Sequence, residues 1–186
     1  MMQFVIGAFF QRIAGLLLLG MLAACSQTPL AVPASGFAVN GKVNILQGNR
    51  SDTAQFAWLA TPEHDQLTLS TPFGSTLAEL TLHYQGSVVS SAVLNRGDLL
   101  EQASNPEELL MRLTGVALPV SGLRWWLRGL PRPDEPFSRD GEALLQNDWR
   151  IIASDYRNGT QPYRIELMRD KLKVRILINQ WNTAVP

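Results

Sequence analysis

The residue types that commonly carry out catalysis are few in this sequence and form no catalytic motif. The histidines are His64, in a predicted turn, and His83, at an outward position of a predicted strand. Neither has the spacing of a metal site or of an activated nucleophile. Asp134-Glu135 and Asp155 could act as acids or bases, but carboxylates in loops are usually solvated. Because no G-x-S-x-G elbow or phosphate-binding loop is present either, we expect neither an enzyme nor a bound metal or cofactor.

A different chemistry is indicated at Cys25, the only cysteine. An apolar run at 13–21 follows Arg12 and is too short to span a bilayer comfortably. The run ends in Leu22-Ala23-Ala24-Cys25, which is similar to the lipobox of bacterial lipoproteins. The similarity implies cleavage before Cys25, a diacylglycerol on its sulfur and an acyl chain on its amine. The alternative is an ordinary cleavage site with a chance cysteine.

The first 35 residues are therefore predicted to direct and anchor the protein. We expect a lipoprotein signal peptide at 1–24 and a lipidated N-terminus with a flexible tether at 25–35, where Pro29, Pro33 and small residues dominate. Several acyl chains, at about 0.8 kcal/mol per buried methylene, hold a protein firmly to a bilayer. Ser26 stands where lipoproteins of the inner membrane typically have aspartate, so the resemblance implies the periplasmic face of the outer membrane of a Gram-negative bacterium.

The rest of the chain, 36–186, is predicted to form one domain. About 150 residues can bury a substantial core. The sequence has 16 basic and 16 acidic residues and no basic cluster, which argues against nucleic acid as a partner. With Cys25 committed to lipid, no disulfide is available, and the fold must rely on packing.

Apolar and polar residues alternate along most of this domain. The segments 163–167 and 172–178 show the clearest alternation, and turn residues such as Gly48-Asn49 and Gln85-Gly86 separate the earlier segments. A period of two is typical of strands with one buried face. The pattern predicts a mainly β fold with short helices, built as a strongly curved antiparallel sheet or an unclosed β-barrel with an apolar inner face.

The segment 105–131 departs from the strand pattern and predicts two short helices. Asn105, Pro106 and Gly115 are typical of the cap, the first turn and the end of one helix. The second is predicted from near Ser121 to Gly129. Their apolar stripes cannot be buried against each other alone, so the helices must lie across the apolar face of the sheet. They either cover a cavity as a lid or fill an ordinary core.

Three motifs follow one another along this domain: Thr71-Pro72-Phe73-Gly74-Ser75-Thr76, then Leu113-Thr114-Gly115 with Leu118-Pro119, then Leu123-Arg124-x-Trp126-Leu127-x-Gly129-Leu130-Pro131. Each is only a turn or an amphipathic piece. Together with the lipobox, their order and spacing resemble the LolB family of outer-membrane lipoproteins. The short tether and the compact loop after Pro131 depart from the family pattern.

The resemblance implies an unclosed barrel with an apolar cavity under a helical lid. It also implies a function, which is to accept acylated lipoprotein cargo from the soluble periplasmic carrier LolA and to insert it into the lipids of the outer membrane. We expect a monomer. The competing hypothesis from a different class is a lipoprotein that only scaffolds an envelope assembly through exposed strand edges.

An acyl carrier needs a dry cavity, because each methylene left in water costs about 0.8 kcal/mol. Leu, Ile, Val and Trp side chains suit such a cavity because they bind chains without directional demands. Each candidate is either a cavity wall or part of an ordinary core. The candidates are Trp58, Leu69, Leu80, Leu82, Leu113, Leu123, Trp126, Leu127, Ile165, Val174 and Ile176.

The second candidate site is the turn around Phe73. Pro72 suits the first corner position of a β-turn and Gly74 tolerates the return, which places Phe73 near the tip. The ring is either exposed, where it can touch a bilayer, or folded back onto the rim of the barrel. The family resemblance implies a protruding loop whose bulky apolar residue is needed for membrane insertion of cargo.

Cys25→Ser should leave a domain that folds and still binds cargo, because the anchor and tether lie outside the strand pattern. Only the location of the protein should change. Cell fractionation, a thermal melt and a cargo-binding assay check this. A variant that failed to fold would contradict the division into tether and domain.

Overall fold

The computed structural model describes residues 36–183 except 134 and 158, so Cys25 and the predicted signal peptide and tether lie outside it. The described residues form one antiparallel sheet and two helices, α2 (Pro106–Thr114) and α3 (Val120–Trp126). The strands are β1 (Phe37–Gln47), β2 (Arg50–Ala60), β3 (His64–Ser70), β4 (Thr76–Gln85), β5 (Val88–Arg96), β6 (Leu99–Ala103), β7 (Ser138–Asp140), β8 (Ala143–Gln146), β9 (Trp149–Arg157), β10 (Gln161–Arg169) and β11 (Leu172–Thr183).

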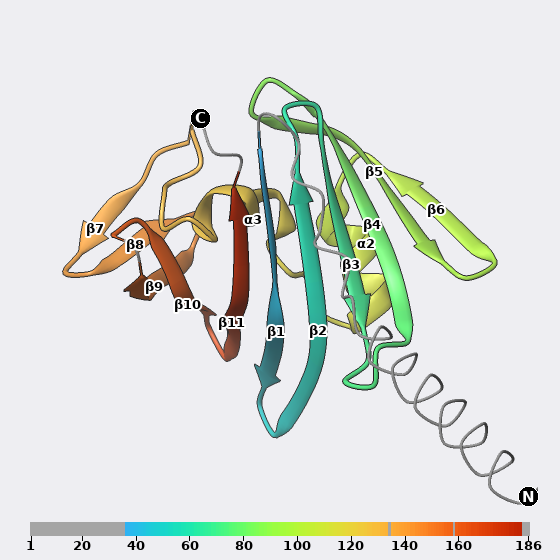
Figure 1. Ribbon diagram of the computed structural model, residues 1–186, viewed down its shortest axis with the longest axis horizontal. Helices are drawn as coiled ribbons and strands as arrows, with labels where there is room; N and C mark the ends of the chain where they lie inside the picture. The colour runs from blue at the N-terminus through green and yellow to red at the C-terminus, as the bar shows by residue number, and fades with distance from the viewer. Residues whose placement is uncertain (1–35, 134, 158, 184–186) are drawn as a thin grey trace, which may run out of the picture. The chain divides into compact units, whose positions relative to one another are not determined.

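The sheet consists of two meanders, one formed by β1 to β6 and the other by β7 to β11. They are joined by the pairing of β1, the first strand, with β11, the last. The strand order is β6-β5-β4-β3-β2-β1-β11-β10-β9-β8-β7, so β1 pairs with both β2 and β11. Figure 1 shows β1 in blue beside β11 in red, with both helices across one face of the sheet. Among the described residues β6 and β7 pair on one side only, so the sheet is unclosed. The predicted antiparallel, unclosed β architecture with two short helices is confirmed.

Side chains on the face toward the helices form continuous apolar rows across the strands. Cross-strand pairing places Val39, Trp58, Leu67, Leu80 and Leu94 in one row over β1 to β5, and all five are buried. A matching row crosses the second meander from Ile45 through Val174, Leu167, Ile151 and Leu144. Directly opposite apolar side chains on one face stabilise neighbouring strands. The rows show that the inward-facing apolar side chains of all these strands belong to one common core.

Helix α2 begins and ends where the sequence predicts. The side chain of Asn105 accepts a hydrogen bond of 3.0 Å from the backbone N–H of Glu107, which satisfies one unpaired donor of the first turn. Gly115 has a positive φ of 74°, and its N–H donates to the carbonyl of Met111. Leu109 and Leu110 are fully buried. The helix therefore rests on the sheet through an apolar face.

Helix α3 is shorter than predicted. It covers Val120–Trp126 and does not continue to Gly129. It has no side-chain cap of its own. Instead, the Glu107 carboxylate of α2 accepts hydrogen bonds from the backbone N–H and the hydroxyl of Ser121, at 3.0 and 2.7 Å. This contact ties the two helices together at their N-terminal turns. No helix among the described residues is long and apolar enough to span a bilayer.

Gly41 marks a bulge in the central strand pair. The register skips one residue of β11 there, because Asn40 faces Gln180 while Gly41 faces Ile178. A Cβ atom at Gly41 would lie 2.1 Å from the carbonyl oxygen of Leu177. Only glycine allows this approach of the two backbones.

Gly41→Ala should destabilise the domain by about 1–3 kcal/mol, the usual cost of forcing atoms into a filled space. Lys42→Ala, on the next and exposed position, is the matched control and should change stability by at most about 0.5 kcal/mol. Urea unfolding of both variants measures the difference. Equal stabilities would show that β1 and β11 adjust without cost.

Candidate functional site

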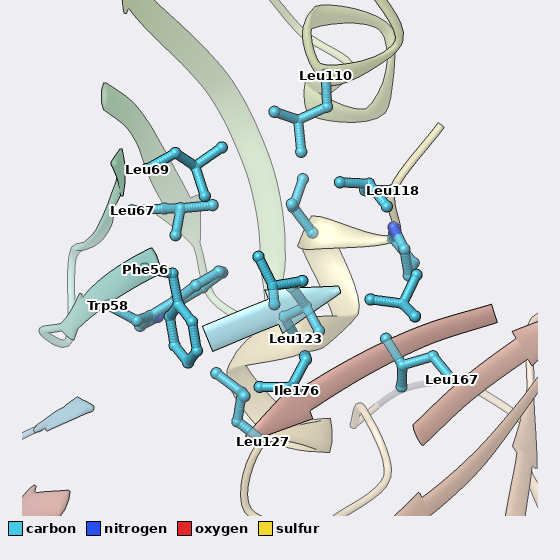
Figure 2. Close-up of a pocket in the computed structure, with 14 residues that line it drawn as sticks. Phe56, Trp58, Leu67, Leu69, Leu110, Leu118, Leu123, Leu127, Leu167 and Ile176 are labelled. Atoms are coloured by element: carbon cyan, nitrogen blue, oxygen red, sulfur yellow. The ribbon is translucent and has the colours of Figure 1, made fainter. Parts of the chain in front are cut away.

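An apolar pocket, which we call the inner pocket, lies between the helices and the sheet. In Figure 2, side chains from both layers point toward one another across it. Its wall is made of aliphatic, aromatic and proline side chains, namely Val43, Phe56, Trp58, Leu67, Leu69, Leu110, Leu118, Pro119, Val120, Leu123, Leu127, Leu167, Val174 and Ile176. Such a wall offers dispersion contacts and no directional hydrogen bonds. It suits hydrocarbon better than a polar ligand.

The inner pocket is small in this conformation. Its volume is about 40 Å³, whereas pockets that enclose drug-sized ligands measure about 300–1,000 Å³. A space of this size holds a few water molecules at most. A long acyl chain does not fit into the pocket in this conformation.

The sequence candidates divide into three groups by position. Trp58, Leu69, Leu123, Leu127, Val174 and Ile176 line the inner pocket. Leu113 lines a second, neighbouring pocket. Leu80, Leu82, Trp126 and Ile165 are almost fully buried in the core and belong to neither wall. Strand alternation and the apolar stripes of the helices predicted an inward position for all of them, but only part of the interior borders a pocket.

The second pocket, which we call the mouth pocket, adjoins the first and has a volume of about 360 Å³. The two pockets share Val43, Leu69 and Leu118. The mouth pocket is open to solvent and is lined by Val43, Ile45, Arg50, Asp52, Thr53, Ala54, Leu69, Leu77, Arg96, Leu113, Thr114 and Leu118. Polar side chains are part of its wall, and it adjoins the apolar inner pocket.

The turn around Phe73 lies beside the mouth pocket. The N–H of Gly74 donates to the carbonyl of Thr71 at 2.9 Å, which closes a β-turn with Pro72 and Phe73 at its corners. Phe73 is 97% exposed. The turn joins β3 to β4, and the nearby Leu69 and Leu77 on these strands line the mouth pocket. An unsupported phenyl ring therefore projects at the end of the sheet where the pocket opens.

A buried polar cluster anchors α3 at the opposite end of β3. Asp65 has no exposed surface, and its Oδ1 lies 3.5 Å from Nη1 of Arg124. The hydroxyl of Tyr84 donates to Oδ2 of Asp65 at 2.8 Å, and the Arg124 guanidinium lies 4.8 Å from the centre of the Tyr84 ring. Arg124 also donates to the carbonyl of Thr61. The cluster holds the helix to β3 and β4 by charge and geometry together.

Burial raises the pKa of Asp65 to about 6, although the nearby positive charge of Arg124 and the hydrogen bond from Tyr84 lower it. Desolvation disfavours the carboxylate more than these partners favour it. The same burial, together with the Asp65 charge, raises the pKa of Tyr84. The cluster thus carries an acid that titrates close to neutral pH.

Gln146 forms a second anchor, at the other side of α3. Its side-chain oxygen accepts hydrogen bonds from Nε1 of Trp126 and the backbone N–H of Arg132, at 2.9 and 2.8 Å. Its amide nitrogen donates to the carbonyls of Arg132 and Glu135. The Trp126 ring packs over Gly122, where a Cβ atom would lie 2.7 Å from the indole. Helix α3 is therefore fixed to β3 and to β8.

Sequence reasoning missed both anchors. His64, which the sequence predicts in a turn, begins β3, and the next residue, Asp65, lies on the same face of that strand as Leu67. Period two, extended backwards from Leu67, would have placed an acid on the buried face. No comparable signal marks Gln146 or Arg124, because their partners are distant in the chain.

The remaining candidates from the sequence show no catalytic arrangement. Nδ1 of His64 lies 3.1 Å from the hydroxyl of Thr61, and the centres of the His64 and His83 rings are 6.3 Å apart. Within the described part of the chain, no group of three or more His, Cys, Asp or Glu side chains could hold a metal ion. Asp155 pairs with Arg157 at an exposed position, and Asp134 lies outside the described residues.

Comparison with known proteins identifies a consistent set of relatives. The family model described as outer membrane lipoprotein LolB matches residues 35–181. Outer-membrane lipoprotein LolB of Pseudomonas fluorescens is 36% identical over 155 residues, 78% of this chain and 74% of that protein. The LolB of Chromobacterium violaceum is 30% identical over 182 residues, 92% and 98% of the two chains. A DUF1329 family protein from Desulfovibrio piger shares the fold alone, with a TM-score of 0.56, 10% identity and coverage of 81% and 86%.

Asp65 predicts a pH dependence of stability with a definite sign. Its pKa is about 6 in the folded state and about 3.9 in an unfolded chain. Between these values the folded state binds more protons, so the free energy of unfolding falls as pH rises from about 4 to beyond 6. At about 1.4 kcal/mol per pKa unit, the total loss is about 3 kcal/mol.

Urea unfolding from pH 4 to pH 8 measures this loss, and Asp65→Asn is the reference because its side chain does not titrate. The unsubstituted protein should lose stability over this range relative to the variant. Parallel pH profiles for the two proteins would show that Asp65 keeps an ordinary pKa.

Proposed function

The chain belongs to the LolB family, and on that premise we propose that it is an outer-membrane lipoprotein that receives acylated lipoproteins from a LolA-like periplasmic carrier and inserts them into the outer membrane. It is anchored through lipidated Cys25 on the periplasmic face. The described domain binds acyl chains between its helices and its sheet and performs no catalysis.

The observation that carries this proposal is the wholly apolar wall of the inner pocket. Fourteen side chains from both helices and both meanders line it. Moving an acyl chain from water onto such a wall lowers its free energy by about 0.8 kcal/mol for each methylene that is covered. A site without directional contacts accepts acyl chains irrespective of the protein attached to them. That tolerance is what a general receptor for lipoproteins requires.

Helices α2 and α3 form the lid, and α2 is the part that moves. Helix α3 is held by the buried contacts of Asp65 with Arg124 and of Gln146 with Trp126. The ion pair from α2 to the sheet, Arg112 with Glu101 at 2.8 Å, is partly exposed. Partly exposed ion pairs contribute about 1 kcal/mol or less. Displacing α2 breaks this ion pair and the hydrogen bonds from Ser121 to Glu107, leaves both buried anchors of α3 intact, and enlarges the space next to the mouth pocket.

The Phe73 turn delivers the cargo. Its 97% exposed ring is not needed for packing, and large apolar side chains at protruding turns commonly mark contact surfaces. Because the turn and the mouth pocket share the ends of β3 and β4, a ring inserted in a bilayer brings the mouth to the membrane surface. Cargo chains then pass from the pocket to the bilayer over a short path.

Phe73→Glu should separate receiving cargo from releasing it. The change removes little packing and should cost at most about 0.5 kcal/mol of stability. Uptake from a loaded carrier should persist, since the inner pocket is unchanged. Insertion into liposomes should fail, because a charge in the acyl region of a bilayer costs several kcal/mol. A thermal melt, a carrier-transfer assay and a liposome-insertion assay test the three statements.

Val88→Glu is the matched control, because Val88 is 55% exposed at the turn between β4 and β5, the other end of the sheet. It should insert cargo normally. Normal insertion by Phe73→Glu would exclude a role of the turn at the membrane. If the unsubstituted protein took up no cargo from the carrier, a scaffold acting through the free edges of β6 and β7 would replace the proposal.

A further inference from the structure

The mouth pocket combines an apolar floor with positive charge at its rim. Val43, Ile45 and Leu69 form part of the floor, while Arg50 and Arg96 form part of the rim. Both arginines lie at strand ends, because β2 begins at Arg50 and β5 ends at Arg96. Neutral acyl chains do not require these charges. The rim therefore indicates a ligand with a charged end as well as a chain.

The charge of Arg96 is not neutralised within the described part of the protein. Asp52 is the acidic side chain in the pocket wall, and its carboxylate lies 2.6 Å from Nε of Arg50. Arg112, on the nearby helix α2, is paired with Glu101. Arg96 forms no ion pair or hydrogen bond with any described side chain. Among the described residues, its guanidinium is a cation without a partner beside the apolar floor.

We propose that the mouth pocket binds an anionic amphiphile with a single acyl chain, whose carboxylate or phosphate pairs with the guanidinium of Arg96 while the chain lies along the apolar floor. The guanidinium presents two parallel N–H groups to such an oxygen pair. The volume of about 360 Å³ falls within the range of pockets for small ligands, about 300–1,000 Å³. The proposal rests on the acyl site of the proposed function and adds a second class of ligand to it.

The position of the mouth pocket favours a ligand from the membrane. The Phe73 turn and both arginines lie at the same end of the sheet, because the β1–β2, β3–β4 and β5–β6 turns are all at that end. When the Phe73 ring enters a bilayer, the arginines lie at the level of the head groups, where cationic side chains are stabilised by anionic lipids. A membrane amphiphile in the mouth covers its apolar floor until cargo displaces it.

The test compares a dansyl-labelled fatty acid with its methyl ester, which has the same chain and no charge. The background is the full chain with Cys25→Ser, so that the protein's own acyl chains do not occupy the site. The acid should bind about fivefold more tightly than the ester, the effect of one partly exposed ion pair. Arg96→Gln should bring the ratio of acid affinity to ester affinity close to one, whereas Arg96→Lys should keep most of the preference for the acid. High salt should lower this ratio in the unsubstituted protein.

Arg150→Gln is the matched control, because Arg150 is an exposed arginine on β9 that is paired with Asp140 and lies outside the pocket wall. Its ratio of acid to ester affinity should equal that of the unsubstituted protein. A ratio near one in the unsubstituted protein, or an equal loss in Arg150→Gln, would overturn the proposal. Circular dichroism of each variant shows that the fold is retained.

Competition distinguishes the possible sources of the anion. Lysophosphatidylglycerol should displace the labelled acid more strongly than zwitterionic lysophosphatidylcholine does, as expected for a lipid head group. Displacement by inorganic phosphate at an equal concentration would overturn the proposal, because a site for a free anion needs no chain. Carrier-to-protein transfer of a lipoprotein is measured separately. Its failure, with the acid-to-ester ratio intact, would reject the proposed function and leave an anionic lipid site.

Discussion

The pairing of β1 with β11 is the contact on which the rest of the structure depends. It joins two meanders that would otherwise be separate sheets, each with an exposed apolar face. Because α2 and α3 lie in the connection between the meanders, this pairing also brings them over the shared inner face. The close approach at Gly41 lets the bulged backbone of β11 stay in register with the apolar rows on both sides. The pocket, lined from both meanders, exists only because of this pairing.

The distribution of polar contacts gives the two helices different strengths of attachment. Asp65 and Gln146 are the polar side chains among the almost fully buried residues, and both hold α3. Such groups are costly to bury without partners, so each pair resists separation. Helix α2 instead depends on apolar contacts, the hydrogen bonds from Ser121 to Glu107 and a partly exposed ion pair. A layer fixed at one helix and looser at the other can enlarge a pocket without unfolding the sheet.

The exposed aromatic ring and the mouth pocket lie at the same end of the sheet. The two ends of the domain therefore differ, as the proposed transfer requires. Phe73, Arg50 and Arg96 all belong to strand ends or turns at that end, whereas the Asp65 anchor lies at the other. Motion of α2 near Leu113 would widen the interior where it already opens, next to the Phe73 turn. Apolar surface released from the pocket would then meet hydrocarbon instead of water, which avoids the main cost of exposing an acyl chain.

The sequence by itself determined the features that depend on neighbouring residues. Alternation predicted the unclosed antiparallel sheet, Asn105 and Gly115 predicted the bounds of α2, and Pro72 with Gly74 predicted a turn with Phe73 near its tip. Whether that ring is exposed or folded back was decided by the tertiary structure, which exposes it. Tertiary structure alone decided which inward side chains line a pocket. Period two treats Leu69 and Leu80 alike, but Leu69 faces the space beside the helices and Leu80 is packed in the core. The tertiary structure also decided the partners of Asp65 and Gln146, because contacts between residues far apart in the chain produce no periodic pattern in the sequence.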